Sequence, residues 1–365
     1  MERYYSVHDI VTFKVVDSTA LLGRLLPSWD SELRDMESPH EAEPDFTVYV
    51  GRFRPHLAGC RAQDDDFYLA EGRLYCRDSV GWARWQLEIS GLDGGAMEVR
   101  IWANPWGLLQ VCELIVNPLV WYVLNRKGFA VCHGSGVARD GQAFVFAGRG
   151  GSGKTTIALD LVRRGYRLLG DHFVILNGGD VLGLPAPLHL MGFNAGPLVA
   201  GGMTARQRLL LRANGLLHRA TGKEIATKVS PRALFPGSLQ ERARLHSAFL
   251  LLPRGRLGVE GMDREGLVAH MVANQWLESL PFTRYMMEYS YLFPQSPLAS
   301  HWTRYEENVR QALDSLENCY RVEVPHTYDA ETLDEIAGMV AGLAGRGDEG
   351  RERQRDEAGC QLQLP

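Results

Sequence analysis

The chain has 365 residues, of which 45% are hydrophobic and 9% aromatic, and its formal net charge at pH 7 is −5. This composition supplies enough apolar side chains for two domains or one large one, and it excludes a chain that is disordered throughout. Basic and acidic residues are interspersed, so we predict no nucleic-acid-binding surface. The six cysteines are far apart without a C-x-x-C pair, which is typical of reduced thiols. With neither a secretion signal nor an apolar run of about 18 residues, we expect a cytoplasmic protein without membrane contact.

Residues 1–106 are predicted to form a β-rich module. Short apolar or alternating runs are separated by turn signals such as Leu92-Asp93-Gly94-Gly95, which favours an antiparallel sheet. The expected strands cover residues 11–16, 46–53, 67–70, 73–76, 82–89 and 97–102. Aromatic side chains at strand spacing are typical of a core, although a peptide-binding face stays open for them. They are Tyr49, Phe67, Trp82, Trp85, Trp102 and Trp106.

Residues 108–127 form an apolar connector with a helical tendency and a break at Asn117-Pro118. Two strands are then predicted over residues 129–137 and 142–147. The Asp140-Gly141 pair between them is typical of a tight hairpin turn. The sequence therefore predicts a hairpin whose second strand leads directly into a glycine-rich segment.

That segment is a complete Walker A motif, which lies between the second strand and a helical pattern over residues 156–164. Glycines allow backbone N–H groups to face phosphate oxygens, and the start of a helix favours the same anion. Lys154 reaches the β- and γ-phosphates, and Thr155 can ligate Mg²⁺. We therefore predict a site for ATP and Mg²⁺. Its residues are Gly148, Arg149, Gly150, Gly151, Ser152, Gly153, Lys154, Thr155 and Thr156.

An acidic residue, Asp171, follows soon after the motif. Gly165 ends the helix, and residues 166–169 are predicted to return as a strand that carries Asp171 at its end. An ionised carboxylate between apolar runs needs a cation or metal as partner, which favours a functional role over that of a turn residue. Asp171 is thus predicted to bind Mg²⁺ or to accept the proton of an acceptor hydroxyl.

The combination of these pieces resembles HPr kinase/phosphorylase and its HPr-kinase-like relatives over about residues 120–260. The matching segments are His133-Gly134, the loop from Gly148 to Thr155, Arg164-Gly165-Tyr166-Arg167-Leu168 and Gly170-Asp171-His172-Phe173-Val174. The resemblance implies a kinase that phosphorylates a serine hydroxyl and whose core is related to phosphoenolpyruvate carboxykinase. It also implies that Asp171 is the catalytic base and that His133 lies against it.

The sequence departs from this family at two places. The second aspartate of the family's pair is replaced by His172, and the glutamate of the following loop has no match between Pro185 and Gly202. The reverse reaction of the bifunctional members is therefore not part of the prediction. The first 106 residues show no resemblance to the family's amino-terminal domain, and they are our candidate for acceptor recognition.

A further cation is expected beyond the motif, because phosphoryl transfer develops negative charge. Lys228, which precedes an apolar strand over residues 248–252, is the candidate for this catalytic role, with Arg232 as a weaker one. The basic segment 205–221 is predicted to be partly helical with a solvated face. Helices are expected over 266–280, 284–292 and 300–316, then a strand over 319–324 and a helix from Asp329 to Leu343.

We thus predict an α/β fold with a P-loop kinase core of the HPr kinase type. Its expected parts are the β-rich N-terminal module 1–106, the core 107–262, a C-terminal helical region 263–344 and a flexible tail 345–365. The predicted enzyme transfers phosphate from ATP to a hydroxyl of a protein, a peptide or a small metabolite. An ATP hydrolase or nucleotide-gated switch, a degenerate nucleotide-binding scaffold and a homo-oligomeric assembly all stay open.

Overall fold

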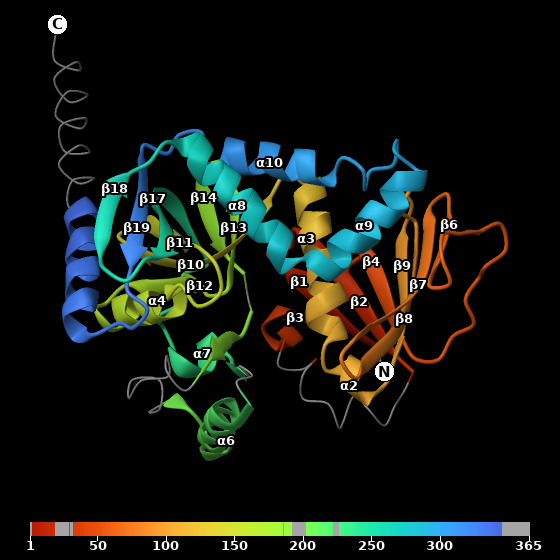
Figure 1. Ribbon diagram of the computed structural model, residues 1–365, viewed down its shortest axis with the longest axis horizontal. Coiled ribbons are helices and arrows are strands. Elements are labelled where there is room, and N and C mark those ends of the chain that lie inside the picture. The colour runs from red at the N-terminus through yellow and green to blue at the C-terminus, as the bar shows by residue number, and fades with distance from the viewer. Residues whose placement is uncertain are drawn as a thin grey trace, which may run out of the picture.

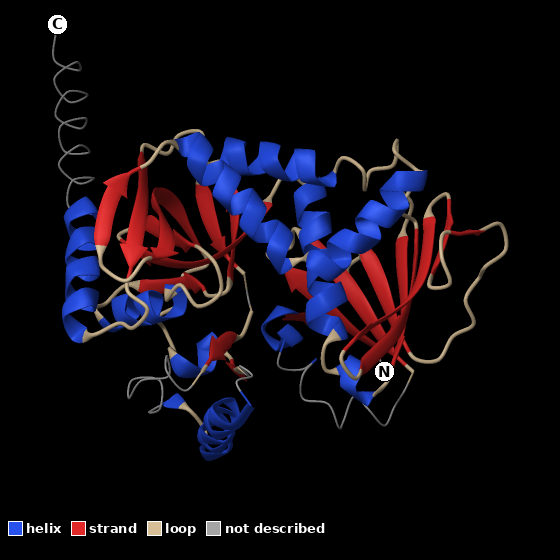
Figure 2. Ribbon diagram, in the orientation of Figure 1, coloured by secondary structure: helices blue, strands red, loops and turns tan. Residues whose placement is uncertain are grey.

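The computed structural model describes residues 2–18, 29, 32–184, 186–191, 202–221 and 226–344. These residues form a mixed α/β structure with two large sheets that lie side by side, and helices run across both (Figures 1 and 2). Within these ranges no helix combines the length and apolar character needed to cross a membrane. The predicted tail, residues 345–365, lies outside the described residues.

The N-terminal sheet has nine strands in the order β3-β1-β2-β4-β9-β8-β7-β6-β5. Most neighbours are antiparallel, as predicted, but β4 runs parallel to both β2 and β9. The prediction of a purely antiparallel sheet is therefore wrong at its centre, because the long connection after β2 returns the chain to the end at which β2 began. The strands are β1 (Glu2–Val7), β2 (Val11–Asp17), β3 (Glu37–Ser38), β4 (Phe46–Val50), β5 (Arg61–Ala62), β6 (Phe67–Ala70), β7 (Arg73–Val80), β8 (Ala83–Ser90) and β9 (Met97–Ala103).

One face of this sheet is buried under helices. Alternate residues of its strands pack against the connector and against a later helix, α9 (Leu280–Leu292). Tyr285 of α9 accepts a hydrogen bond from Trp85 Nε1 (3.0 Å) and donates one to Asp78 Oδ2 (2.8 Å). Phe67 and Trp85 thus belong to the core, whereas Trp82 and Trp106 are 78% and 55% exposed. The aromatic residues of the module therefore divide between core and surface.

The connector is helical with an irregular turn where the sequence predicts a break. A π-helical turn, η2 (Cys112–Val116), leads into α3 (Asn117–Arg126), and Pro118 lies at the start of α3. Proline lacks the N–H that a regular helix would use here, and the wider π turn accommodates this loss. The short helices η1 (Arg34–Met36) and α2 (Pro105–Leu108) flank this region.

The second sheet carries the Walker A motif. Five of its strands form a closed ring, in which neighbours pair in the order β11, β10, β13, β14 and β17, and β17 pairs again with β11. Beyond β17 the sheet continues with β19 and β18. The predicted hairpin is confirmed: Asp140 and Gly141 have positive φ angles of 51° and 77°. Its strands are β10 (Ala130–Arg139), β11 (Gln142–Ala147), β12 (Arg167–Gly170), β13 (Phe173–Asn177), β14 (Asp180–Gly183), β17 (Arg242–Pro253), β18 (Gly258–Gly261) and β19 (Asn318–Val324).

Helices pack on both sides of this sheet. The helix α4 (Lys154–Arg163) and the last helix, residues 330–344, share one apolar cluster with it. The helices α8 (Arg264–Glu278) and α10 (His301–Ala312) share another. Below the sheet in Figure 1 lie α7 (Pro231–Leu234), the hairpin of β15 (Leu188–Leu190) and β16 (Thr227–Val229), and α6 (Ala205–Thr221).

The segment 263–344 contacts both halves of the molecule. Its strand β19 pairs with β17 in the second sheet, whereas α9 packs on the N-terminal sheet. Asp329 caps the last helix as predicted, since its Oδ1 accepts a hydrogen bond from Thr332 N at 2.8 Å. This segment therefore connects the two sheets and holds them next to each other.

A buried polar network ties α10 to α3. Asn125 Nδ2 donates to His301 Nδ1 (3.0 Å) and to the His301 carbonyl (2.9 Å). Asn308 Nδ2 in turn donates to Asn125 Oδ1 at 2.7 Å. Because His301 Nδ1 accepts a hydrogen bond, its ring is neutral with the proton on Nε2. Burial, with a smaller effect of Arg304, lowers the pKa of His301 to about 3.

This network predicts an acid-sensitive fold. The folded pKa of His301 lies below its ordinary value of 6.5, so its stabilising contribution is present above pH 6.5 and is lost as pH falls towards about 3. Over that window the free energy of unfolding should fall by about 1.4 kcal/mol per pH unit from this group. Denaturant titrations at several pH values should show a shallower slope for His301→Gln. The exposed His270→Gln should keep the wild-type slope, and an unchanged slope in His301→Gln would refute the assignment.

Candidate functional site

The Walker A residues form a loop between β11 and α4. The parallel pairing of β11 with β17 fixes the strand from which the loop begins. The loop turns at Ser152, whose N–H donates to the Arg149 carbonyl (3.1 Å). The first hydrogen bond of the helix follows, from Ile157 N to the Gly153 carbonyl (3.0 Å). Gly153 is the N-cap of α4, with a left-handed φ of 84°. The helix therefore directs its first N–H groups, which have no partner within the helix, towards the loop.

Several polar groups of this loop are left for a bound anion. Ser152 Oγ is buried and has no hydrogen-bond partner in the described part of the chain. Within the same part, no backbone hydrogen bond is donated by Gly150, Gly151 or Gly153. Buried polar groups are nearly always paired in folded proteins, so Ser152 Oγ requires a ligand or solvent, whereas Gly150 and Gly151 are exposed and their N–H groups are open to either. The donor character of this set fits the phosphate oxygens of a nucleotide.

Lys154 folds back over the same loop. Its Nζ donates to the carbonyl oxygens of Gly148 (2.7 Å) and Arg149 (2.9 Å), and the side chain is buried. Burial lowers the pKa of Lys154 to about 8, whereas the carboxylates of Asp171 and Glu278 act in the opposite direction. The ammonium form therefore predominates at neutral pH. The structure thus holds a cation at the loop.

Tyr328, from the segment between β19 and the last helix, clamps this loop. Its hydroxyl donates to the Ser152 carbonyl at 2.7 Å, and its ring covers Gly153 so closely that a Cβ added there would lie 2.3 Å from ring atoms. Burial raises the pKa of the Tyr328 hydroxyl, which keeps it protonated as a donor. The loop conformation therefore depends on glycine at position 153 for two reasons, its positive φ and this contact.

Gly153→Ala is expected to destabilise the loop. The positive φ alone costs about 1–3 kcal/mol for alanine, and the Tyr328 ring must also move. We expect a lower melting temperature and weaker nucleotide binding, which thermal unfolding and nucleotide titration would measure. Gly150→Ala is the matched control, because a Cβ at Gly150 meets nothing within 4 Å. Equal effects of the two substitutions would contradict this account.

Asp171 lies directly against the start of α4. Thr155 Oγ1 donates to both carboxylate oxygens of Asp171, at 2.9 and 3.0 Å, and Ser135 Oγ of β10 donates to Oδ1. Asp171 is 2% exposed. The two predicted magnesium ligands, Thr155 and Asp171, are thus in contact, and their hard oxygen atoms fit Mg²⁺. The same carboxylate is placed to accept a proton from a hydroxyl that approaches the loop.

His133 has different partners from those that the resemblance implies. Its Nδ1 lies 3.1 Å from Glu278 Oε1, at the end of α8. Asn274 Nδ2, one turn earlier on α8, lies within hydrogen-bonding distance of the carbonyl oxygens of His133 (3.3 Å) and Gly148 (3.1 Å). No hydrogen bond or ion pair of the described residues joins His133 to Asp171. Ser135 lies two residues along β10 from His133, and alternate residues of a strand share a face. On that face it is Ser135, and not His133, that contacts Asp171.

Glu278 links three parts of the site. Its Oε1 lies 3.1 Å from both His133 Nδ1 and Arg149 Nη1. Burial raises the pKa of Glu278, but its hydrogen bond with His133 and the nearby positive charges outweigh this effect and the pKa is lowered. Burial in turn lowers the pKa of His133. Asn274 Nδ2 lies 3.1 Å from the same His133 Nδ1, so an amide and a carboxylate both contact this ring nitrogen.

His172, the residue that replaces the family's second aspartate, has a left-handed φ of 70°. Its ring stacks on His189, with centroids 4.6 Å apart, and meets the edge of His133 at 5.0 Å. Burial lowers the pKa of His172 well below its usual range, and its positively charged or titratable neighbours lower it further. Backbone strain of this kind is common at functional sites. The position therefore presents a neutral imidazole rather than a carboxylate next to Asp171.

Lys228 forms its ion pairs outside the Walker A loop. It lies on β16, and its Nζ forms ion pairs with Glu32 and with Glu113, the latter at 3.0 Å. Burial lowers the pKa of Lys228, but these two carboxylates outweigh it and the pKa is raised. No contact of the described residues joins Lys228 to residues 148–155. The hairpin of β15 and β16 turns this lysine towards the N-terminal half, which its position in the sequence does not reveal.

The remaining predicted residues lie in or beside the loop. Arg149 is exposed apart from its ion pair with Glu278, and Thr156 lies in the first turn of α4. Sequence reasoning missed Ser135, Asn274, Glu278 and Tyr328. The four-residue spacing of Asn274 and Glu278 places both on one face of the predicted helix, but nothing in the sequence shows which strand that face meets. The segment between Pro185 and Gly202, where the family's glutamate has no match, lies largely outside the described residues.

Comparison with known proteins adds no identification. No model of a protein family matches the chain, and no curated protein matches it.

Proposed function

We propose that the protein is an ATP-dependent kinase of the HPr-kinase-like type, which phosphorylates a hydroxyl group. The observation that carries this proposal is the contact of Asp171 with Thr155 at the start of α4, beside the buried Lys154. A carboxylate, a hydroxyl and an ammonium group at a donor-rich loop are the groups that phosphoryl transfer requires. The HPr-kinase-like resemblance supports the same reading.

In the proposed reaction, the chain holds ATP through the loop 148–153 and Lys154. Bound Mg²⁺, held by Thr155 and Asp171, would neutralise phosphate charge. The acceptor hydroxyl oxygen forms a bond to the γ-phosphorus while the bond to the β–γ bridging oxygen breaks, and ADP leaves. Asp171 accepts the hydroxyl proton, and Lys154 stabilises the charge that develops on the phosphate oxygens.

The other residues of the site position these groups. Ser135 donates to Asp171 and restricts the rotation of its carboxylate. Glu278 fixes the orientation of both His133 and Arg149. Because Lys228 pairs with Glu32 and Glu113, the proposal assigns charge neutralisation to Lys154 and not to Lys228. Transfer then depends mainly on positioning and on charge stabilisation.

The proposal is tested by measuring ADP formation with and without hydroxyl acceptors. The acceptors are serine-containing peptides, proteins encoded by neighbouring genes and small hydroxylated metabolites. A kinase forms ADP in proportion to acceptor, and label from γ-labelled ATP appears on the acceptor. ADP formation that is independent of every acceptor would instead indicate an ATP hydrolase or switch, and tight ATP binding without turnover would indicate a scaffold.

A further inference from the structure

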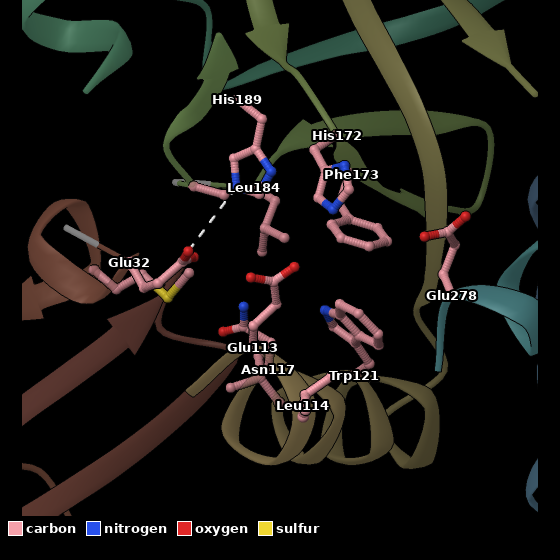
Figure 3. Close-up of a pocket in the computed structure, with 13 residues that line it drawn as sticks. Glu32, Glu113, Leu114, Asn117, Trp121, His172, Phe173, Leu184, His189 and Glu278 are labelled. Atoms are coloured by element: carbon pink, nitrogen blue, oxygen red, sulfur yellow. Dashed lines mark ion pairs between the residues drawn. The ribbon is translucent and has the colours of Figure 1, made fainter. Parts of the chain in front are cut away.

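The carboxylates that line the small cavity between the two sheets are already paired (Figure 3). Glu32 and Glu113 share the ammonium group of Lys228, and Glu278 forms an ion pair with Arg149. Charged side chains that have no ion-pair partner in the described part of the chain lie instead on the surface, and several of them belong to one helix, α6.

The helix α6 packs on the second half of the molecule through one face. Leu211 contacts the apolar cluster that α4 shares with the second sheet. Asn214 Nδ2 donates to Thr227 Oγ1 of β16 at 3.1 Å. Leu211 and Asn214 share a face of the helix because they are three positions apart. The opposite face is therefore directed away from the second sheet, and α6 lies at the lower border of the molecule in Figure 1.

The opposite face of α6 exposes leucines. Leu209 and Leu216 are 68% and 66% exposed, and the neighbouring Leu210 is 45% exposed. Residues seven positions apart lie on the same side of a helix, so Leu209 and Leu216 form one apolar stripe. A helix on the surface of a globular protein normally turns such a stripe to the core. Exposed apolar side chains that are grouped in this way are typical of a binding surface.

Arginines flank these leucines. Arg206, Arg212 and Arg219 each lie three positions from a leucine of the stripe. All three are exposed, and none forms an ion pair within the described residues. The sequence has no acidic residue over 181–223, although the net charge of the whole chain is −5. We call this side of α6 its outer face, and it consists of Arg206, Leu209, Leu210, Arg212, Leu216 and Arg219.

A second exposed apolar cluster lies at the same border of the molecule. The rings of Trp82 and Trp106 meet edge to face, with centroids 6.0 Å apart, and both side chains are mostly exposed. Trp106 belongs to α2, and both α2 and α6 lie along the lower border in Figure 1. Tryptophan is favoured where an apolar phase meets water, because its ring is apolar and its N–H is polar. A flat surface along this border can therefore contact both clusters.

An outer face that is both apolar and positively charged matches an occupant with apolar groups and negative charge. The surface of a bilayer with anionic lipids offers both, since acyl chains accommodate leucine side chains and the head groups attract arginines. An acidic protein also complements the arginines. The bilayer fits better, because one flat surface contacts α6 and the tryptophan pair at the same time.

We propose that this border, with the outer face of α6 and the tryptophan pair, binds the surface of a bilayer that contains anionic lipids. Arginines interrupt the leucines of α6, so the helix lies in the plane of the surface and does not cross the bilayer. The proposal departs from the expectation of no membrane contact, which rests on the lack of a long apolar run. It does not depend on the proposed kinase function.

Flotation of the full chain with lipid vesicles tests the proposal. We compare vesicles of phosphatidylcholine alone with vesicles that also contain about 30% phosphatidylserine, which supplies the negative charge. We expect at least about tenfold tighter binding to the anionic vesicles, because each arginine near such a surface adds to the attraction. Higher salt should weaken this binding, since it screens the charges.

Three variants test which side chains bind the vesicles. The double variant Leu209→Gln, Leu216→Gln removes the apolar stripe and should weaken binding about tenfold or more. The double variant Arg206→Gln, Arg212→Gln removes two positive charges and should have an effect of similar size, about tenfold or more. Trp82→Ala should weaken binding about threefold or more, because it removes an exposed ring of the second cluster.

The matched control is the double variant Arg256→Gln, Val259→Gln. It changes an exposed arginine and an exposed apolar residue next to and on β18, in the upper part of Figure 1, and should bind as wild type. Thermal unfolding shows that each variant is folded. Equal binding to both kinds of vesicle, or wild-type affinity in any of the three test variants, would overturn the inference. Binding to polyglutamate and not to vesicles would identify an acidic protein partner and would also overturn it.

Discussion

Lys154→Ala is expected to lower kcat/KM for phosphoryl transfer by at least about 100-fold, because the ammonium group is the buried cation at the Walker A loop. In the structure its Nζ binds two loop carbonyls, and we expect it to turn to phosphate oxygens when ATP is present. Alanine removes that charge and leaves the Gly148 and Arg149 carbonyls without this donor. ATP affinity should therefore fall together with turnover, which equilibrium nucleotide titration and steady-state kinetics would measure separately.

Lys127→Ala is the matched control for this substitution. Lys127 forms an ion pair with Asp45 at 2.6 Å and donates to the Ile10 carbonyl, on the side of α3 that faces the N-terminal sheet. Its loss removes a lysine and an interaction between elements but leaves the loop untouched. We expect near wild-type ATP affinity for Lys127→Ala. If Lys154→Ala retained both ATP affinity and turnover, the assignment of the loop as a phosphate site would be wrong.

Asp171→Asn should lower kcat by about 10²–10⁴-fold, the usual contribution of a general base, while ATP binding is largely kept. Asparagine has nearly the same shape and can still accept a hydrogen bond from Thr155 through its carbonyl oxygen. It cannot take up the proton of the acceptor. Loss of turnover with retained nucleotide binding would separate a role in chemistry from a role in folding.

Asp160→Asn is the control for a buried carboxylate that serves structure alone. Asp160 lies on α4 and forms ion pairs with Arg163 (2.8 Å) and Arg164 (2.6 Å). Its replacement should lower thermal stability and leave turnover of the folded protein close to wild type. Comparable loss of turnover in both variants would show that Asp171 acts through stability.

Much of the fold could be predicted because local patterns decide it. The hairpin at Asp140-Gly141, the helix after the Walker A motif and the strand and cap around Asp329 all follow from turn residues, glycines and apolar periodicity. The parallel position of β4 could not be predicted, since it depends on where a long connection returns. Likewise, the wider turn before Pro118 was expected as a break, but its π geometry was not.

In the candidate site, too, the sequence predicts local contacts but not contacts between distant segments. Lys154, Thr155 and Asp171 lie close together in sequence and form a single unit, so a motif could identify them. Asn274 and Glu278 reach the site from a helix more than a hundred residues later, and only tertiary packing brings them to His133. The ion pair of Lys228 with Glu32 could not be predicted for the same reason, because Glu32 belongs to the N-terminal half. Contacts between distant segments carry no signal in the local pattern of a single sequence.

The most direct test of the central claim is to identify the phosphorylated product by phosphorus NMR, with wild-type protein, ATP, Mg²⁺ and an acceptor that stimulates ADP formation. The proposal predicts a phosphate monoester on the acceptor hydroxyl in a one-to-one ratio with ADP, and no ester with Asp171→Asn. Inorganic phosphate in place of the ester, at the same rate in wild type and Asp171→Asn, would contradict both the kinase function and the role of Asp171.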